Sequence, residues 1–270
     1  MGDQSRKLNP KIVAVANQKG GVGKTTTTIN LAAALAEIGK RILIIDLDPQ
    51  GNSSTGLGIQ PDRRQLTTFE LLLEDIDLKS VILETDVENL SIVPATVDLS
   101  SADIELYTNE KRVFVLRGVL KQQSMSELGF DFIFIDCPPS LNLLTINAMV
   151  ASNSVLIPLQ SEFFALEGLS QLMLTIREVR ATANKDLRIE GVVLTMFDSR
   201  NNLSLLIEED ARENLGDLVF KSKIPRNVRV SEAPSHSKPV LSYDPISKGA
   251  QSYRDLAFEF LKNNQRAWAE

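Results

Sequence analysis

A glycine-rich stretch near the start of the chain has the residue types of a phosphate-binding loop. It follows an apolar run at residues 12–16, precedes a helix-forming stretch, and reads Lys19-Gly20-Gly21-Val22-Gly23-Lys24-Thr25-Thr26. Glycines adopt backbone angles closed to other residues, so successive N–H groups can point at phosphate oxygens, and the helix dipole adds positive charge there. This stretch is therefore predicted to bind a nucleotide, with Lys24 reaching the terminal phosphates and the Thr25 hydroxyl binding Mg²⁺.

The first lysine of this loop departs from the usual phosphate-binding pattern. In G-x-x-x-x-G-K-[ST] a glycine would stand at position 18, which is Gln18 here, and Lys19 opens the loop instead. The stretch resembles the deviant Walker A motif, K-G-G-x-G-K-T, of the ParA/MinD class of P-loop ATPases. A glycine-rich turn without a ligand is the simpler interpretation, which the strand before the loop and the helix after it disfavour.

Two aspartates leave the second apolar run, at residues 41–46. Asp46 and Asp48 stand two residues apart, so both carboxylates can face the same way at the edge of a parallel sheet where ligands bind. One can support the Mg²⁺ shell, and the other can position a water for attack on the γ-phosphate. Resemblance to the D-x-D-P-Q-G motif of the same class implies that Asp48 is catalytic and that Asp46 supports the metal. The alternative is a polar turn, which Asp-Pro also favours.

A third aspartate, Asp136, follows four apolar residues, which is the Walker B arrangement. We expect its carboxylate to reach Mg²⁺ through a water. The stretch from Asp136 to Ser140 resembles the D-x-P-P-S segment of the same class, which senses the γ-phosphate, and Ser140 is expected to cap the next helix. Cys137, the single cysteine, has no evident base partner and is interpreted as a packing residue. One cysteine also disfavours an iron–sulfur protein of this class.

Apolar runs alternate with helical patterns along almost the whole chain. Most runs are continuous and rich in Val and Ile, as in strands buried on both faces of a parallel sheet. We therefore predict an α/β fold: a doubly wound, mostly parallel sheet with helices on both faces. Strands are expected at residues 12–16, 41–46, 90–94, 132–136, 154–159, 189–196 and 218–220, and helices at residues 25–38, 68–73, 101–123, 143–151, 166–183, 203–215 and 247–266.

The size and composition fit one cytoplasmic domain. The chain has 270 residues, of which 43% are hydrophobic, enough for one large core. No apolar run approaches the ~20 residues that span a bilayer, and the polar first ten residues contain no secretory signal. We expect residues 1–10 to be a disordered tail and residues 11–270 to form a single P-loop ATPase domain.

The net charge of −6 conceals a basic segment between residues 221 and 254. Seven basic residues oppose two acidic ones there, a local charge of +5. Nucleic-acid binding depends on the local field more than on the total charge. Within this segment Pro225, Arg226 and Asn227 are expected to follow a short strand at the ligand edge and to contact the adenine base. Each basic residue could instead belong to an ordinary solvated face.

The stretch from Ile224 to Ser235 closely resembles the I-P-R-N-V-R-L-S-E-A-P-S stretch of chromosomal ParA/Soj proteins. With the earlier motifs, the chain is similar to a ParA/Soj-type DNA-partition ATPase over about residues 11–265. The resemblance implies a homodimer that sandwiches ATP, in which Lys19 reaches the partner's phosphates as a catalytic and nucleotide-binding residue. It also implies Mg²⁺-dependent ATP hydrolysis that is slow without an activator.

The same resemblance implies nonspecific binding of double-stranded DNA through Arg200 and Arg229, and Lys248 is a further candidate for a DNA contact. Hydrolysis would release the DNA, a ParB-like centromere-binding protein would activate it, and the cargo would be a chromosome, a plasmid or a protein cluster. The protein would then lie in the cytoplasm on the nucleoid. His236, the lone histidine, is expected to be a loop residue.

Two alternatives remain from other functional classes. MinD relatives end in a basic amphipathic helix that lies on membranes, and here apolar residues recur at helical spacing near the C-terminus. That end is only mildly basic, so a helix docked on the domain and no membrane contact are expected. The apolar residues at helical spacing near the C-terminus are Tyr253, Leu256, Ala257, Phe260 and Leu261.

The second alternative is a metabolic P-loop enzyme, such as a dethiobiotin-synthetase-like ligase. It shares the fold but would leave the basic segment without a role.

Overall fold

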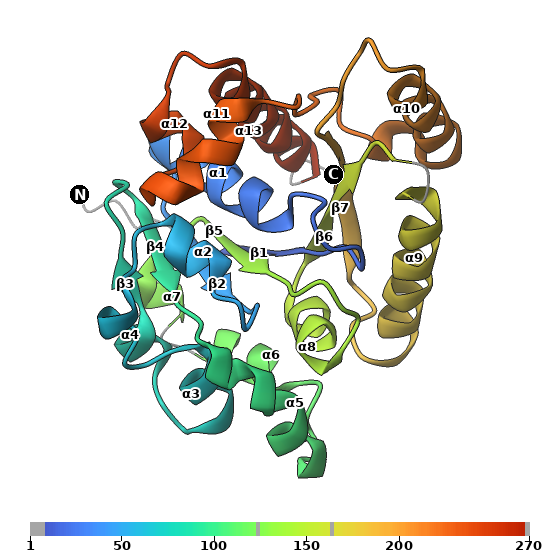
Figure 1. The fold of residues 1–270 in the computed structure, drawn as a ribbon. Helices are drawn as coiled ribbons and strands as arrows, with labels where there is room; N and C mark the ends of the chain where they lie inside the picture. The colour runs from blue at the N-terminus through green and yellow to red at the C-terminus, as the bar shows by residue number, and fades with distance from the viewer. Residues whose placement is uncertain (1–8, 123–124, 163–164, 268–270) are drawn as a thin grey trace, which may run out of the picture.

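The computed structural model describes residues 9–122, 125–162 and 165–267. These residues form a seven-stranded sheet in the order β3-β4-β2-β5-β1-β6-β7 (Figure 1). Neighbouring strands are parallel except β3, which is antiparallel to β4. The strands are β1 (Lys11–Val15), β2 (Ile42–Asp46), β3 (Leu83–Glu84), β4 (Leu90–Val93), β5 (Phe132–Asp136), β6 (Ser154–Gln160) and β7 (Arg188–Thr195).

Helices cover both faces of this sheet (Figure 1). One face packs against α1 (Lys24–Glu37), α12 (Val240–Tyr243) and α13 (Lys248–Ala267). The opposite face packs against α3 (Thr68–Leu73), α4 (Leu78–Val81), α5 (Ala102–Glu105), α6 (Val115–Leu120), α8 (Leu143–Ala151), α9 (Ala165–Thr182) and α10 (Asn202–Leu215). The predicted doubly wound α/β fold is therefore confirmed.

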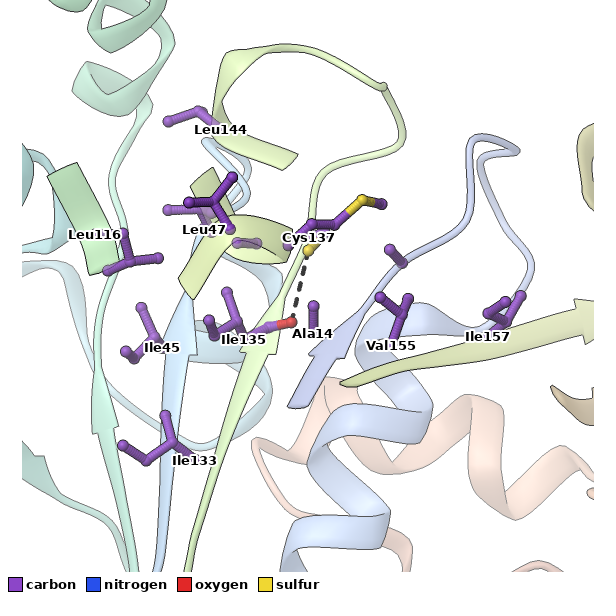
Figure 2. Close-up of a cluster of buried hydrophobic side chains, with 14 of the residues drawn as sticks. Ala14, Ile45, Leu47, Leu116, Ile133, Ile135, Cys137, Leu144, Val155 and Ile157 are labelled. Atoms are coloured by element: carbon purple, nitrogen blue, oxygen red, sulfur yellow. Dashed lines mark hydrogen bonds between the residues drawn. The ribbon is translucent and has the colours of Figure 1, made fainter. Parts of the chain in front are cut away.

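Alternate side chains of each central strand enter the two cores. Figure 2 shows Ile133 and Ile135 of β5 on the face that also receives Leu144 of α8. Cys137 lies fully buried in this cluster, and its Sγ is 3.7 Å from the carbonyl oxygen of Ile135. Burial raises the pKa of the Cys137 thiol, so the side chain stays neutral and packs as an apolar group.

The strand registers bring the three chemical motifs to one edge of the sheet. Asp46, the last residue of β2, pairs with Asp136, the last residue of β5. Val15, which ends β1 just before the phosphate loop, pairs with Asp136 from the other side. The loop and both carboxylates therefore meet at the carboxyl edge, where ligands bind in parallel sheets.

The prediction of one continuous helix at residues 101–123 was wrong. The chain instead forms a 3₁₀ turn at Val97–Ser101, then α5, a second turn at Leu106–Thr108, and α6. Asn109 interrupts the helix because its Oδ1 accepts a hydrogen bond from the N–H of Lys111 at 2.8 Å. Such local side-chain bonds replace helical backbone bonds. Gln123 of the expected helix lies outside the described residues.

The strand expected at residues 218–220 was also wrong. A 3₁₀ turn occupies Gly216–Leu218, and only a single bridge joins Val192 to Val219. The carboxylate of Glu259 accepts hydrogen bonds from the N–H groups of Lys221 and Ser222, so these groups cannot extend a sheet ladder. Pro225 to Asn227 therefore do not follow a strand.

Smaller differences concern short elements and caps. Asn142, not Ser140, caps α8, because its Oδ1 accepts a hydrogen bond from the N–H of Thr145. The expected division into a tail at residues 1–10 and one domain at residues 11–270 stays a prediction, and residues 1–8 lie outside the described part. The elements that the sequence pattern missed are β3, α2 (Asn52–Gly56), α4, α7 (Met125–Leu128), α11 (Val228–Glu232) and α12.

A polar network closes the opposite, amino-terminal edge of the sheet. Lys11 at the start of β1 contacts both Glu190 of β7 and Asn264 of α13. Asn264 in turn donates to the Glu190 carboxylate at 2.7 Å. The apolar face of α13, which includes Tyr253 and Phe260, is buried against the sheet and α1. The C-terminal helix is thus an integral part of the core.

Candidate functional site

The phosphate loop connects the end of β1 to α1 as predicted. Gly21 and Gly23 have φ of 73° and 85°, a conformation that favours glycine. Gly23 is the N-cap of α1, so the first turn of that helix opens toward the loop. The hydroxyl of Thr195, the last residue of β7, donates to the carbonyl oxygen of Val22 at 2.8 Å and fixes the loop from the other side.

Lys24 is held inside this loop. Its Nζ donates to the carbonyl oxygen of Lys19 at 3.0 Å, and the residue is almost fully buried. Burial lowers the pKa of Lys24, while Asp136 and Asp48 oppose that shift. An ammonium group with few protein partners at a helix N-terminus is well placed to bind an anion.

Lys19 forms an ion pair within its own chain. Its Nζ is 2.8 Å from Oε2 of Glu162, which lies just beyond the end of β6. Its backbone N–H donates to Oδ1 of Asn17, and the amide of Asn17 donates to the carbonyl oxygen of Pro158. The loop entrance is therefore fixed, whereas the lysine side chain is about a third exposed.

Asp136 is fully buried and surrounded by hydroxyl groups. Ser53 of α2 donates to its Oδ2 at 2.8 Å, and Thr28 of α1 lies 3.2 Å from its Oδ1. Burial raises the pKa of Asp136 to about 6, and hydrogen bonds from Ser53 and Thr25 oppose the shift. Thr25, whose hydroxyl is predicted to bind Mg²⁺, therefore lies beside this carboxylate.

Asp46 is also fully buried, next to Asp136. Its Oδ2 accepts hydrogen bonds from the backbone N–H and the hydroxyl of Ser54, at 2.9 and 2.6 Å. Burial, together with the charge of Asp136, raises the pKa of Asp46 to about 7. Two neighbouring buried carboxylates favour the uptake of either a proton or a cation.

Asp48 lies in the loop after β2 with only 6% of its surface exposed. Its Oδ1 accepts a hydrogen bond from the N–H of Gln50 at 2.9 Å, which orients the carboxylate. Asp46 and Asp48 are joined by a bond from the N–H of Asp48 to Oδ1 of Asp46. The second oxygen of Asp48 has no protein donor among the described residues, so it is available to a water molecule.

A cavity of about 210 Å³ adjoins the phosphate loop. Pro225, Arg226 and Asn227 line it, beside Gly23 and Thr26 of the loop and the start of α1. The structure thus brings together the residues predicted to hold the base and those predicted to hold the phosphates. Sequence reasoning missed other lining residues, which come from the end of β7, α11 and α13: Thr195, Met196, Val230, Ser231 and Tyr253.

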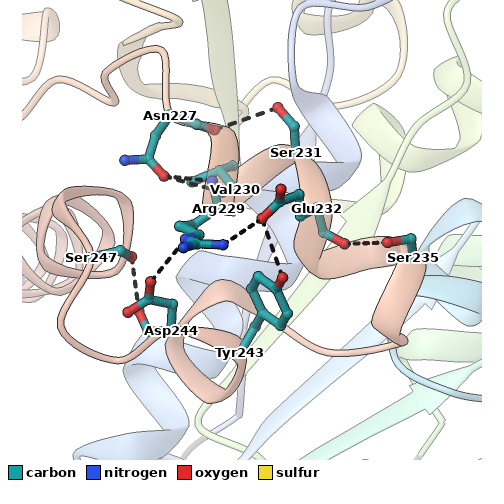
Figure 3. Close-up of polar contacts among 9 residues, drawn as sticks. All are labelled: Asn227, Arg229, Val230, Ser231, Glu232, Ser235, Tyr243, Asp244 and Ser247. Atoms are coloured by element: carbon teal, nitrogen blue, oxygen red, sulfur yellow. Dashed lines mark hydrogen bonds and ion pairs between the residues drawn. The ribbon is translucent and has the colours of Figure 1, made fainter.

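The basic segment is less positive in the structure than in the sequence. Lys223 pairs with Glu208, and Arg254 pairs with Glu37, both outside the segment. Arg229 pairs with Glu232 and Asp244 (Figure 3). Over residues 9–122, 125–162 and 165–267, no ion pair within 4 Å is found for Lys221, Arg226, Lys238 and Lys248.

The three predicted DNA contacts are all accessible. Arg200 is 88% exposed, and its Nε, Nη2 and backbone N–H donate three hydrogen bonds to Asp198, which hold the pKa of that carboxyl at about 2. Arg229 is 52% exposed, and Lys248 is an exposed residue at the start of α13. His236 lies in a short 3₁₀ turn with its ring stacked on Tyr243.

Comparisons with known proteins agree with this site. A family described as an AAA domain matches residues 10–189. The chain is 52% identical over 253 residues to the sporulation initiation inhibitor protein Soj of Bacillus subtilis, covering 94% of this chain and 99% of Soj. It is 50% identical over 258 residues to the chromosome partitioning protein ParA of Caulobacter vibrioides, covering 95% and 96%.

A solved structure shows the same fold around a nucleotide. Cobyrinic acid a,c-diamide synthase from Mycobacterium smegmatis, solved with bound ADP and magnesium, superposes with a TM-score of 0.80. The two chains are 36% identical, and the match covers 95% of this chain and 96% of that one. No helix in the described part of the chain is long and apolar enough to cross a membrane. With about half of its residues identical over nearly its whole length, the chain belongs to the ParA/Soj family of chromosome-partitioning ATPases.

Proposed function

We propose that this ATPase binds ATP with Mg²⁺ at the carboxyl edge of the sheet and uses it to assemble a DNA-binding homodimer. The observation that carries the nucleotide site is the convergence of the Lys24 loop with the buried carboxylates of Asp46 and Asp136. The structure of the magnesium- and ADP-bound relative supports the choice of ligand.

The residues around Asp136 fit a divalent cation. Hydroxyl and carboxylate oxygens are the donors that Mg²⁺ prefers, and Thr25 and Asp136 supply both. Burial raises the pKa values of Asp136 and Asp46, so a cation that neutralises these carboxylates would be stabilised there. Thr25 and Asp136 would hold the ion, and Asp46 would support it through the α2 segment. The ion, when bound, supplies positive charge to the phosphate oxygens.

Hydrolysis in this proposal uses Asp48 to orient the attacking water. Its carboxylate accepts one backbone N–H and keeps its other oxygen available. Lys24 neutralises the charge that develops on the transferred phosphoryl group, as positioned cations do in other P-loop enzymes. Because no second activating group is evident in the described site, turnover is expected to be slow until a ParB-like partner binds.

Lys19 is proposed to connect two copies of the chain. Its side chain lies at the entrance of the loop, where Lys24 already serves the chain's own nucleotide. On dimerisation it exchanges Glu162 for the partner's phosphates, so ATP holds the two chains together. Light scattering should show an ATP-dependent dimer that Lys19→Ala abolishes and that the surface control Lys79→Ala retains. A Lys19→Ala protein that still dimerises would overturn this role.

DNA binding is proposed to depend on Arg200, Arg229 and Lys248. A dimer aligns two copies of this surface, which multiplies the phosphate contacts and makes binding both ATP-dependent and salt-dependent. The test is a gel shift with an arbitrary duplex, with and without ATP, at two salt concentrations. Absence of any ATP-dependent shift at low salt would contradict the proposal. The protein would then lie in the cytoplasm on the nucleoid and move a chromosome, plasmid or protein cluster.

The MinD-like alternative is less well supported by the geometry. The apolar residues of α13 that could enter a membrane are buried, Tyr253, Leu256 and Phe260 among them. Liposome sedimentation with ATP separates the two functions, since a membrane-associated protein would sediment and a DNA-binding protein would not. A metabolic ligase would instead hydrolyse ATP only with a second substrate.

A further inference from the structure

Arg229, one of the proposed DNA contacts, is already occupied by carboxylates (Figure 3). Its Nη1 donates to Oε2 of Glu232 at 2.9 Å, and its Nε lies 3.2 Å from Oδ2 of Asp244. Guanidinium groups bind carboxylates and phosphates through the same N–H groups. Two carboxylates around one guanidinium also leave a local negative charge, which repels a phosphate.

Further contacts hold the carboxylate of Glu232 and the backbone of Asp244. Oε2 of Glu232 also accepts a hydrogen bond from the Tyr243 hydroxyl at 3.2 Å. The carbonyl oxygen of Asp244 accepts bonds from the N–H and the hydroxyl of Ser247, at 3.1 and 2.8 Å. The cluster is therefore an organised arrangement that links α11, α12 and the start of α13 (Figure 3).

We propose that Glu232 and Asp244 compete with DNA phosphate for Arg229, and that filling the base cavity releases the Asp244 contact. This inference rests on the DNA-binding function proposed above and adds its regulation. DNA affinity is then set by a balance between an internal carboxylate and an external phosphate on the same guanidinium.

The two contacts differ in how they can respond to a nucleotide. Glu232 and Arg229 lie three residues apart on α11, so their contact moves with that helix. Asp244 follows α12, which is attached to α1 because Asn30 Oδ1 accepts a hydrogen bond from the N–H of Val240 at 2.7 Å. The Arg229–Asp244 contact therefore spans two helices, α11 and α12, which the hydrogen bond from Tyr243 to Glu232 also joins.

The helix that carries Arg229 also forms a wall of the base cavity. Asn227 caps α11 by accepting hydrogen bonds from the N–H groups of Arg229 and Val230, at 2.9 and 3.3 Å. Asn227 and Val230 both line the cavity. A base that enters the cavity and shifts this wall moves Arg229 away from Asp244, while the Glu232 contact is retained.

The test measures binding of a fluorescein-labelled duplex of arbitrary sequence by anisotropy, with no nucleotide, with ADP and with a non-hydrolysable ATP analogue. An exposed ion pair contributes up to ~1 kcal/mol, so removing one competitor should tighten binding up to about fivefold. Asp244→Asn should give this gain without nucleotide and a smaller gain with nucleotide. Glu232→Gln should give a similar gain in every state.

Two controls separate competition from a simple change in charge. Asp86→Asn removes the same charge from the turn between β3 and β4, at the amino-terminal edge of the sheet, and should leave DNA affinity unchanged. Repeating Asp244→Asn and Glu232→Gln in an Arg229→Ala background should abolish both gains. Gains that persist without Arg229, or no gain at all, would overturn the inference although DNA binding stands. A wild-type protein that binds no DNA in any state would instead overturn the proposed function.

Discussion

Gly249 offers a stringent test of how the C-terminal helix shapes the nucleotide site. This residue lies in the first turn of α13, and a Cβ added to it would stand 2.3 Å from Cγ2 of Val230 and 3.3 Å from Oδ1 of Asn227. Both neighbours line the base cavity and belong to α11 or its cap. Gly249→Ala therefore forces the wall of the cavity to move.

The magnitude follows from two opposing effects. Alanine is favoured over glycine in a helix by up to about 1 kcal/mol, whereas forcing a methyl group into a packed contact costs about 1–3 kcal/mol. The matched control is Gly118→Ala, because a Cβ at Gly118 in α6 would have no atom within 4 Å. The free energies of unfolding of the two variants should differ by about 1–3 kcal/mol, with Gly249→Ala the less stable.

Thermal unfolding followed by circular dichroism measures this difference. At about 2–4 °C per kcal/mol for a chain of this size, the melting temperatures should differ by roughly 2–12 °C. A fluorescent ADP analogue should bind more weakly to Gly249→Ala than to Gly118→Ala. Equal melting temperatures would refute the contact with Val230, and unequal stability with equal ADP affinity would refute its role in the cavity.

Three further predictions concern the carboxylates. Asp48→Ala should retain ATP binding and lower turnover about 100-fold or more, as measured by phosphate release, because a positioned base is lost; turnover within a few-fold of wild type would remove Asp48 from the mechanism. Burial raises the pKa of Asp46 above its unfolded value, so the stability of the nucleotide-free protein should fall as pH rises from about 4 to 7. Thermal melts of Asp46→Asn should show a flatter pH profile. A profile as steep in the variant as in the wild type would contradict this prediction. The carboxyl of Asp198 should titrate near pH 2 by NMR and return toward 3.8 in Arg200→Ala; an unchanged value in that variant would show that Arg200 is not the cause.

The sequence was informative where a function depends on adjacent residues. The apolar runs that end in Asp46 and Asp136 predicted both the parallel strands and their ligand edge, because a buried parallel strand leaves a continuous apolar signal. The phosphate loop was predicted for the same reason: its glycines, lysine and threonine are neighbours in the chain.

The rest depended on contacts between residues far apart in the chain. Thr195 fixes the loop at Val22 across 173 positions, and Glu162 binds Lys19 across 143. No local sequence pattern predicts contacts between residues so far apart in the chain. The predicted long helix at residues 101–123 failed for the opposite reason, because one local bond from Asn109 outweighed a favourable helical pattern.

The network at the amino-terminal edge has a consequence for how the chain could be rebuilt. Lys11, near the start of the described chain, contacts Asn264, close to its end, on the side of the sheet away from the nucleotide site. A short flexible linker could therefore join the two ends without crossing the catalytic edge. New termini opened in the exposed turn around Asp86 would give a circular permutant, and fluorescent tags placed there would stand at the edge of the sheet opposite the ATP loop.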